Sequence, residues 1–309
     1  MYPKAYLEII KDVCIKHSIG IQFFPGESIL RLSQNDNVHY IWSRRFDLNS
    51  AISARIADNK FATYIVLYSF NVPTIECIKL SRMDTEEYAN SEIGNVEACQ
   101  KLLSTNSSIV IKPNNSYEGT DVYKCESVKD IEKTLQLLGN KYKFLIVSPF
   151  IESVAEYRVI YLNGKIMFIY QKVRPYLVCD GKSSVMELLV KSNYNLTQLD
   201  NKVMRQISNV YPEGYTLQLS WKFNLSQGAN CIPVTDDNLR NNVSYLALTA
   251  AKAINISFAT IDILQSNTGE LYVLEINAGV AMDQFIQKYP NGRDLAFSIY
   301  EKAVLSMFN

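Results

Sequence analysis

Two polar residues stand inside an apolar run near the C-terminal end of the chain. The stretch 271–283, LYVLEINAGVAMD, places Glu275 and Asn277 where a buried strand is expected to continue. Because side chains alternate across a strand, these two residues should share one face and Ile276 should take the other. A carboxylate beside an amide in a buried space needs a cation or polar partner, so this pair is a candidate for chemistry.

A second carboxylate lies on the preceding strand. Residues 258–266 and 270–278 flank the turn NTG, which predicts a hairpin whose pairing brings Asp262 close to Glu275. We expect no cationic side chain nearby, so the two carboxylates would need a metal ion. Oxygen ligands favour Mg²⁺, which binds a few carboxylates together with substrate phosphates. The alternative is a partly exposed edge carboxylate and a turn asparagine.

A magnesium site of this kind predicts phosphate-binding groups elsewhere in the chain. In IVIKPNNSYEG, residues 109–119, Lys112 ends an apolar strand and a small polar loop follows. Such a loop can present backbone N–H groups to phosphate. Lys60, in ADNKFAT, is a second candidate cation, for which a solvated helix residue is the alternative.

Composition limits the class of protein. The chain has 309 residues, of which 48% are hydrophobic, so a packed core and about two domains are expected. Lys plus Arg and Asp plus Glu are both 31, which supports neither a nucleic-acid groove nor a polybasic membrane patch. No apolar run approaches the roughly 20 residues of a membrane-spanning helix. The first residues do not resemble a signal peptide, because acidic residues interrupt them.

The cysteines and histidines argue against metal or disulfide scaffolds. The six cysteines are scattered without a C-x-x-C pair, and the two histidines are far apart. We therefore expect free thiols in a reducing cytoplasm.

The hydrophobic pattern predicts helices mixed with hairpins. Helical spacing covers residues 6–17, 49–72 with a turn at Asn59, 128–139, 185–192, 241–255 and 295–308. Strand patterns cover residues 19–24, 28–33, 38–43, 108–115, 143–151, 157–173, 258–266 and 270–278. This mixture predicts α+β domains with antiparallel sheets.

The order of the motifs resembles the ATP-grasp superfamily of carboxylate–amine ligases, in particular the modules of cyanophycin synthetases and bifunctional glutathione synthetases. The likeness runs over residues 47–309, through Lys60, VIKP, IVSPFIESVAEYRV, CDGKSSVMELL, KFNLSQGA, IDI and EIN. It implies two α+β subdomains that grip ATP between antiparallel sheets. The implied division is a short N-terminal region (1–55), a central subdomain with a phosphate-covering loop (56–143) and a C-terminal subdomain with the adenine hinge and magnesium site (144–309).

The resemblance also implies roles for individual residues. Mg²⁺, expected as two ions, would be held by Asp262, Glu275 and Asn277. ATP would be bound by Lys60, Lys112, the covering-loop residues Ser116 and Gly119, the adenine hinge Ser148, Pro149, Phe150 and Ile151, and the ribose-binding Glu156. The reacting groups would face Arg158, Lys222 and Asn224. The covering loop is poorer in glycine than is usual in the family, and Ala229 replaces a second glycine of the KFNLSQGA segment.

The implied activity is ADP-forming ligation of an amino acid or small peptide carboxylate to an amine through an acyl phosphate. Three alternatives stay open: glutathione synthetase proper, a ligase that modifies a ribosomal peptide, and a nucleotide-binding kinase or regulator without ligation. No nucleic-acid or membrane partner is expected, and a homodimer is left open. Because no Mur-ligase-like or glutamate–cysteine ligase domain accompanies these motifs, we expect a freestanding module.

Overall fold

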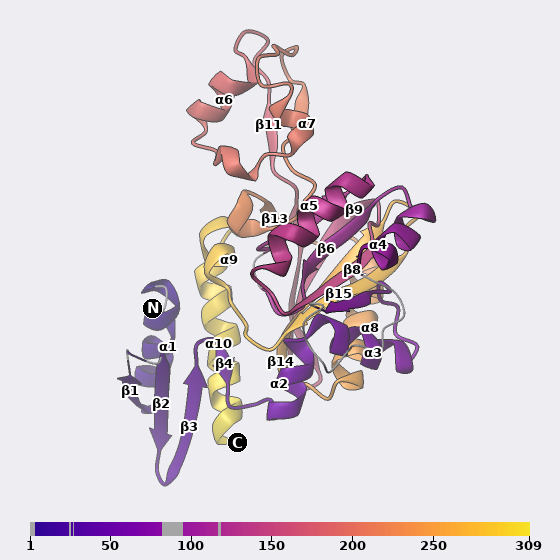
Figure 1. Cartoon of the computed structure of the whole chain (residues 1–309). Helices are drawn as coiled ribbons and strands as arrows, with labels where there is room; N and C mark the ends of the chain where they lie inside the picture. Colours follow the sequence, from indigo (N-terminus) through magenta and orange to yellow (C-terminus); the bar gives the residue numbers. More distant parts are fainter. Residues whose placement is uncertain (1–3, 25, 27, 82–94, 117–118) are drawn as a thin grey trace.

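The computed structural model describes residues 4–24, 26, 28–81, 95–116 and 119–309. Within these residues the chain forms two four-stranded sheets, a five-stranded sheet and a two-stranded sheet, with helices packed against them (Figure 1). The pairings between strands in the sheets are antiparallel. The α+β class expected from the sequence is confirmed.

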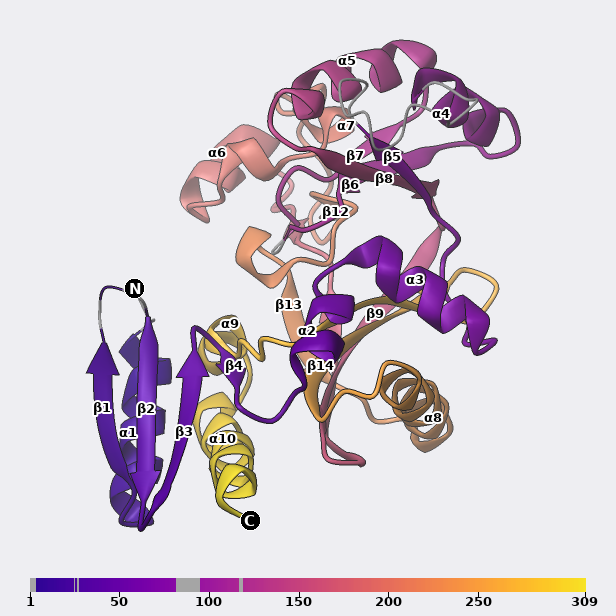
Figure 2. The ribbon, with the colours of Figure 1, turned by 60° about the horizontal axis from the view of Figure 1, so that its bottom comes forward.

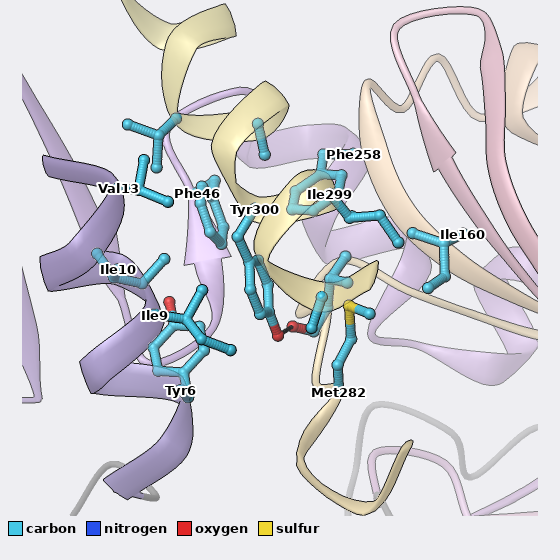
Figure 3. Close-up of a cluster of buried hydrophobic side chains, with 14 of the residues drawn as sticks. Tyr6, Ile9, Ile10, Val13, Phe46, Ile160, Phe258, Met282, Ile299 and Tyr300 are labelled. Atoms are coloured by element: carbon cyan, nitrogen blue, oxygen red, sulfur yellow. Dashed lines mark hydrogen bonds between the residues drawn. The ribbon is translucent and has the colours of Figure 1, made fainter. Parts of the chain in front are cut away.

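The two ends of the chain share one hydrophobic core. The N-terminal sheet runs in the order β1 (Gly20–Phe24), β2 (Ile29–Gln34), β3 (Asn37–Trp42) and β4 (Arg45–Phe46). Helices α1 (Lys4–Lys16) and α10 (Gly292–Phe308) pack together beside this sheet (Figure 2). Their aromatic rings meet in the core, where Tyr6 and Tyr300 lie edge to face at 5.2 Å (Figure 3). The last helix therefore anchors the first segment of the chain.

The five-stranded sheet is the largest layer of the molecule. Its order is β13 (Asn230–Pro233), β10 (Lys165–Val173), β9 (Ser153–Leu162), β14 (Phe258–Ser266) and β15 (Leu271–Asn277). Apolar side chains on one face pack against α2 (Ala51–Ala57), α3 (Lys60–Ser69) and α8 (Asp237–Ala253) (Figure 2). Ile261, Ile263 and Ile276 belong to that core, so the alternating residues of β14 and β15 face the other way.

The central sheet lies across from the large one. Its order is β5 (Ile78–Ser81), β8 (Phe144–Pro149), β6 (Ile109–Pro113) and β7 (Tyr123–Cys125). Helices α4 (Asn95–Ser104) and α5 (Val128–Gly139) cover its outer face (Figure 2). Ser127 starts α5 by accepting a hydrogen bond from the Asp130 N–H, which explains the sharp start of this helix.

A small module stands apart from these layers at the top of Figure 1. It contains β11 (Tyr176–Val178), β12 (Thr216–Gln218), α6 (Val185–Lys191), the 3₁₀ turn η2 (Leu196–Gln198) and α7 (Asn201–Met204). It has a hydrophobic cluster of its own, in which Leu189 is fully buried. The chain returns from it through the 3₁₀ turn η3 (Leu225–Gln227), and α9 (Asp283–Lys288) packs against that turn.

Several local predictions are confirmed. The break at Asn59 separates α2 from α3, because the Asn59 side chain caps α3 by accepting from the Ala62 N–H. The Asn163–Gly164 turn between β9 and β10 has positive φ at both residues, as a tight hairpin requires.

Short elements escaped prediction. Helix α4, helix α9 and the two strands of the small module were not predicted, since they have only 10, 6, 3 and 3 residues and so offer little periodic pattern. The chain's division at residues 55 and 143 stays a prediction. Because β8 pairs with β5 and β6, we propose placing the second boundary after Pro149. In the part of the chain that the structure describes, no helix is long and apolar enough to cross a membrane.

Candidate active site

A cavity of about 690 Å³ opens between the large sheet, the central sheet and the segment around β4. This volume is within the usual range for small-molecule sites. Every residue to which the sequence analysis gave a role in catalysis, ATP binding or metal binding lines this cavity: Lys60, Lys112, Ser116, Gly119, Ser148, Pro149, Phe150, Ile151, Glu156, Arg158, Lys222, Asn224, Asp262, Glu275 and Asn277. The structure thus brings the predicted residues together, and their individual roles remain predictions.

Strand register sets the charged face of the large sheet. Asp262 on β14 is the cross-strand partner of Glu275 on β15, as the hairpin predicted. On its other side Asp262 is the partner of Arg158 on β9, and Arg158 in turn is the partner of Tyr170 on β10. Two residues further along the same pair of strands, Glu156 on β9 is the cross-strand partner of Lys172 on β10. The strands β10, β9, β14 and β15 therefore present polar side chains on the same face of the sheet.

Asp262 has close cationic neighbours, so the expectation of none was wrong. Arg158 donates from Nε to Oδ1 at 2.7 Å and from Nη2 to Oδ2 at 2.6 Å. Lys172 Nζ donates to Asp262 Oδ2 at 3.0 Å and to Glu156 Oε1 at 2.5 Å. Both cations come from strands about a hundred residues earlier in the chain, which only the sheet register places beside Asp262.

Burial and charge act against each other in this network. Burial alone would raise the pKa of Asp262, but Arg158 and Lys172 hold that pKa well below its usual range. Burial raises the pKa of Glu156, against the opposing pull of Lys172. The pKa of Lys172 is raised despite its burial, because Asp262 and Glu156 favour the ammonium form. Two cations and two carboxylates therefore balance one another in this buried network, and neither carboxylate is without a cationic partner.

Glu275 and Asn277 are the more available oxygen donors. Asn277 Nδ2 donates to Glu275 Oε1 at 3.2 Å, and Glu275 Oε2 lies 4.0 Å from Lys60 Nζ. The Glu275 side chain is 25% exposed, whereas that of Asp262 is 2% exposed. Glu275 can therefore take up a ligand without leaving a buried ion pair broken.

These donors fit a hard cation that is shared with phosphates. One lone pair of Asp262 Oδ1, the Glu275 carboxylate and the Asn277 amide oxygen form an oxygen-only set. Arg158, Lys172 and Lys60 offset the local carboxylates, so the protein alone offers little net negative charge to a bare ion. Among the described residues, no group of three or more His, Cys, Asp or Glu is arranged to hold a metal ion.

Lys60 lies at the start of α3, in the wall across from Glu275. Its Nζ donates to the Ser116 carbonyl at 2.5 Å, and its side chain is only 11% exposed, which excludes a solvated helix residue. Asn114, itself buried, accepts from the Lys60 N–H through its carbonyl and from the Phe61 N–H through its side chain. Burial lowers the pKa of Lys60, and Glu275 partly opposes this. The helix start and the covering loop are thus joined by hydrogen bonds.

The covering loop also approaches the KFNLSQGA segment. Gly119 has φ +65°, and a Cβ placed there would lie 2.7 Å from Asn224 Nδ2. Asn224 itself starts η3, because its Oδ1 accepts from the Ser226 N–H at 3.1 Å. Tyr117 and Glu118, which belong to the same predicted loop, lie outside the described residues.

Two aromatic side chains line the cavity beside β8, where the sequence predicts the adenine hinge. Phe150, just beyond β8, meets Trp221 edge to face at 5.3 Å, and the apolar Val110 and Leu264 also line the cavity. A flat aromatic base fits such surroundings better than a charged group. Lys222 follows Trp221, and burial lowers the pKa of its ammonium.

Several cavity residues were not predicted. Lys172 had a usable signal, since a lysine inside the strand FIYQKV implies a buried partner. The sequence indicated a place in the site less clearly for Trp221 than for Lys172. Nothing in the sequence connected Arg44, Arg45 or Asp283 with the site. These three come from segments that only the fold brings together.

Comparison with known sequences identifies related proteins. Residues 199–302 match the RimK-like ATP-grasp domain. Cyanophycin synthetase of Nostoc sp. (strain PCC 7120) is 23% identical over 88% of this chain and 32% of its own length. The glutathione biosynthesis bifunctional protein GshAB of Streptococcus mutans is 23% identical over 79% of this chain and 34% of its own length. The chain thus spans about a third of the length of these curated relatives.

Solved structures share the fold. A bifunctional glutathione synthetase from Pasteurella multocida superposes with a TM-score of 0.59 and 18% identity, over 96% of this chain and 44% of the other. The D-alanine–D-alanine ligase of Bacillus anthracis gives a TM-score of 0.54 and 15% identity, over 85% of this chain and 73% of the other. The resemblance inferred from the motifs is confirmed: the chain shares the fold of these ligases, and its residues 199–302 match the RimK-like ATP-grasp domain.

Proposed function

We propose that this protein is an ADP-forming carboxylate–amine ligase that uses ATP and Mg²⁺. Its substrates are an amino acid or small peptide carboxylate and an amine, and the product is an amide or peptide bond. The six cysteines are free and buried, which is in keeping with a reducing cytoplasm as the place of action. The observation that carries the proposal is the convergence of cations, oxygen donors and an apolar hinge on one cavity.

The parts of the cavity suit successive parts of ATP. The apolar end at Phe150 and Trp221 would receive adenine, and the Pro149 carbonyl and Ile151 N–H would meet its edge. Glu156 would face the ribose. Lys60 and Lys112 would bind phosphate oxygens as point charges.

In the reaction, a substrate carboxylate oxygen attacks the γ-phosphorus, and the bond from that phosphorus to the bridging oxygen breaks to release ADP. The amine nitrogen then attacks the acyl carbon, phosphate leaves, and the nitrogen loses its proton. Phosphoryl transfer depends mainly on positioning and charge neutralisation. Arg158, Lys222 and Asn224 would hold the transferred group and the reacting carboxylate. Mg²⁺, at Asp262, Glu275 and Asn277, would neutralise phosphate charge.

Trapping the activated carboxylate tests the proposal. The protein is incubated with ATP, Mg²⁺ and amino acids or dipeptides, with hydroxylamine in place of the amine. An acyl phosphate should yield a hydroxamate, together with phosphate released in equal amount. ADP release without hydroxamate for any carboxylate would instead favour a kinase or a nucleotide-binding regulator.

A further inference from the structure

The wall of the cavity around β4 differs in chemistry from the part around Lys60 and Lys112, where the phosphates of ATP are proposed to bind. It is lined by Ser43, Arg44, Arg45, Gly279, Ala281, Asp283, Gln284 and Gln287. Apart from the two arginines and Asp283, the lining is small or uncharged. The role of this wall is not accounted for by ATP or the metal.

Arg44 and Asp283 form the centre of this wall. Arg44 donates to Asp283 Oδ2 from Nε at 3.0 Å and from Nη2 at 2.6 Å. Two of its five N–H donors are thus used in this pair, so it can still bind a second acceptor. Arg45 lies beside it and donates to Asp58 Oδ2 at 2.7 Å.

Asp283 carries an unused acceptor. Its Oδ1 is buried and has no hydrogen-bond partner among the residues that the structure describes. Buried carboxylate oxygens are rarely left without a donor, because such an oxygen has lost water without a replacement. A ligand N–H group at this position would supply the missing hydrogen bond.

The backbone around the pair is held firmly. The Val280 N–H donates to the Arg44 carbonyl at 3.1 Å, and Tyr300 Oη donates to the Val280 carbonyl at 2.9 Å. Tyr300 is fully buried in the core shared by the chain ends (Figure 3). The loop after β15 and the turn before β4 are therefore fixed against each other, and the two charges keep their places.

We propose that this wall binds the zwitterionic head of a free α-amino acid, one of the two substrates of the proposed ligase. The proposal rests on that function. Asp283 Oδ1 accepts from the ammonium group, and Arg44, with Arg45 beside it, binds the carboxylate. An adjacent cation and anion complement a molecule whose ammonium and carboxylate share one carbon. An interior residue of a peptide has neither group, and a peptide end has one.

The experiment compares free amino acids with blocked forms. Each of the twenty amino acids, its methyl ester and its N-acetyl derivative is titrated calorimetrically into the whole protein with Mg²⁺ and a non-hydrolysable ATP analogue. At least one free amino acid should bind, and each blocked form should bind at least about tenfold more weakly. Calorimetry reads binding without ligation, so failure of the ligase chemistry with intact selective binding would sink the proposed function and leave this site standing.

Matched variants assign the two charges. Arg44→Gln should reduce the loss of affinity that the methyl ester causes relative to the free amino acid. Asp283→Asn should reduce the loss of affinity that the N-acetyl group causes. Arg44→Lys should restore part of the discrimination if Arg44→Gln folds poorly. Arg293→Gln and Asp47→Asn remove the same groups outside the cavity, where these side chains are 48% and 55% exposed, and should leave both losses of affinity unchanged.

Affinity for the ATP analogue is the folding control for every variant. Equal binding of free and blocked forms would overturn the proposal. So would binding of none of the twenty amino acids, or losses of affinity that persist in Arg44→Gln and Asp283→Asn.

Discussion

The two walls of the cavity are built in opposite ways. On the sheet face, Arg158, Lys172, Glu156 and Asp262 bond one another inside a continuous antiparallel ladder. On the facing wall, Lys60 is placed by a helix start and by one loop carbonyl. The first wall is specified by register along whole strands, whereas the second depends on a few local contacts.

This difference predicts different responses to substitution. A residue in the sheet network cannot be neutralised without leaving a buried partner charge, so changes there should destabilise the protein strongly. Residues at the edge of the network and in the facing wall make fewer buried ion pairs and hydrogen bonds. Changes to them should alter turnover or nucleotide affinity with little loss of stability.

The largest effect is expected from Asp262→Asn. The variant leaves Arg158 and Lys172 without their shared carboxylate and should lower the free energy of unfolding by about 3–5 kcal/mol. Urea denaturation followed by circular dichroism measures this. As a control, Asp237→Asn removes a carboxylate that is 87% exposed and 3.7 Å from Arg240, and should leave the midpoint unchanged. Equal shifts in the two variants would contradict the comparison.

Glu275→Gln should show the opposite pattern. Glu275 is 25% exposed, and among the described residues its one ion pair is the long contact with Lys60 at 4.0 Å, so stability should change by less than about 1 kcal/mol. Turnover should fall by about 100-fold, because an amide binds Mg²⁺ more weakly than a carboxylate and the ion would neutralise phosphate charge. Steady-state ADP release measured over a range of Mg²⁺ concentrations tests this. ADP production close to that of the unmodified protein would remove Glu275 from the metal site.

Gly119→Ala tests the contact between the covering loop and the KFNLSQGA segment. The new Cβ would lie 2.7 Å from Asn224 Nδ2, so Asn224 must shift, and turnover should fall by about tenfold. Gly164→Ala is a matched control, since Gly164 also has positive φ but nothing lies within 4 Å of its Cβ position. Both variants should lose about 1 kcal/mol of stability through backbone strain. Equal turnover in the two would argue against the contact.

The smallest expected effect is a change in pH dependence. Burial lowers the pKa of Lys60 below its usual 10.5, so its positive charge is lost earlier than usual as pH rises. Nucleotide affinity should therefore decline on the alkaline side. Lys60→Arg keeps the charge at all these pH values, so the decline should be weaker. Calorimetric titration of an ATP analogue between neutral and alkaline pH measures both curves, and identical alkaline declines would exclude Lys60 as a phosphate ligand.

The sequence predicted the parts of the site that depend on local pattern. Alternation in LYVLEIN and the NTG turn were enough to place Asp262 opposite Glu275. The order of the motifs identified the remaining predicted residues, and these line one cavity. The cations around Asp262 could not be found in this way, because Arg158 and Lys172 become its neighbours only through pairing of distant strands. The wall at Arg44 and Asp283 was missed for the same reason, being assembled from opposite ends of the chain.

The identity of the spent nucleotide tests the central proposal most directly. In the proposed site the metal and cations would lie toward the γ-phosphate, so a substrate carboxylate should attack the γ-phosphorus. The protein is incubated with ATP, Mg²⁺ and each carboxylate that gives a hydroxamate, and the nucleotides are separated by chromatography. We expect ADP and phosphate, formed only when the carboxylate is present. AMP and pyrophosphate as products would contradict the proposed mechanism and the assignment of the site.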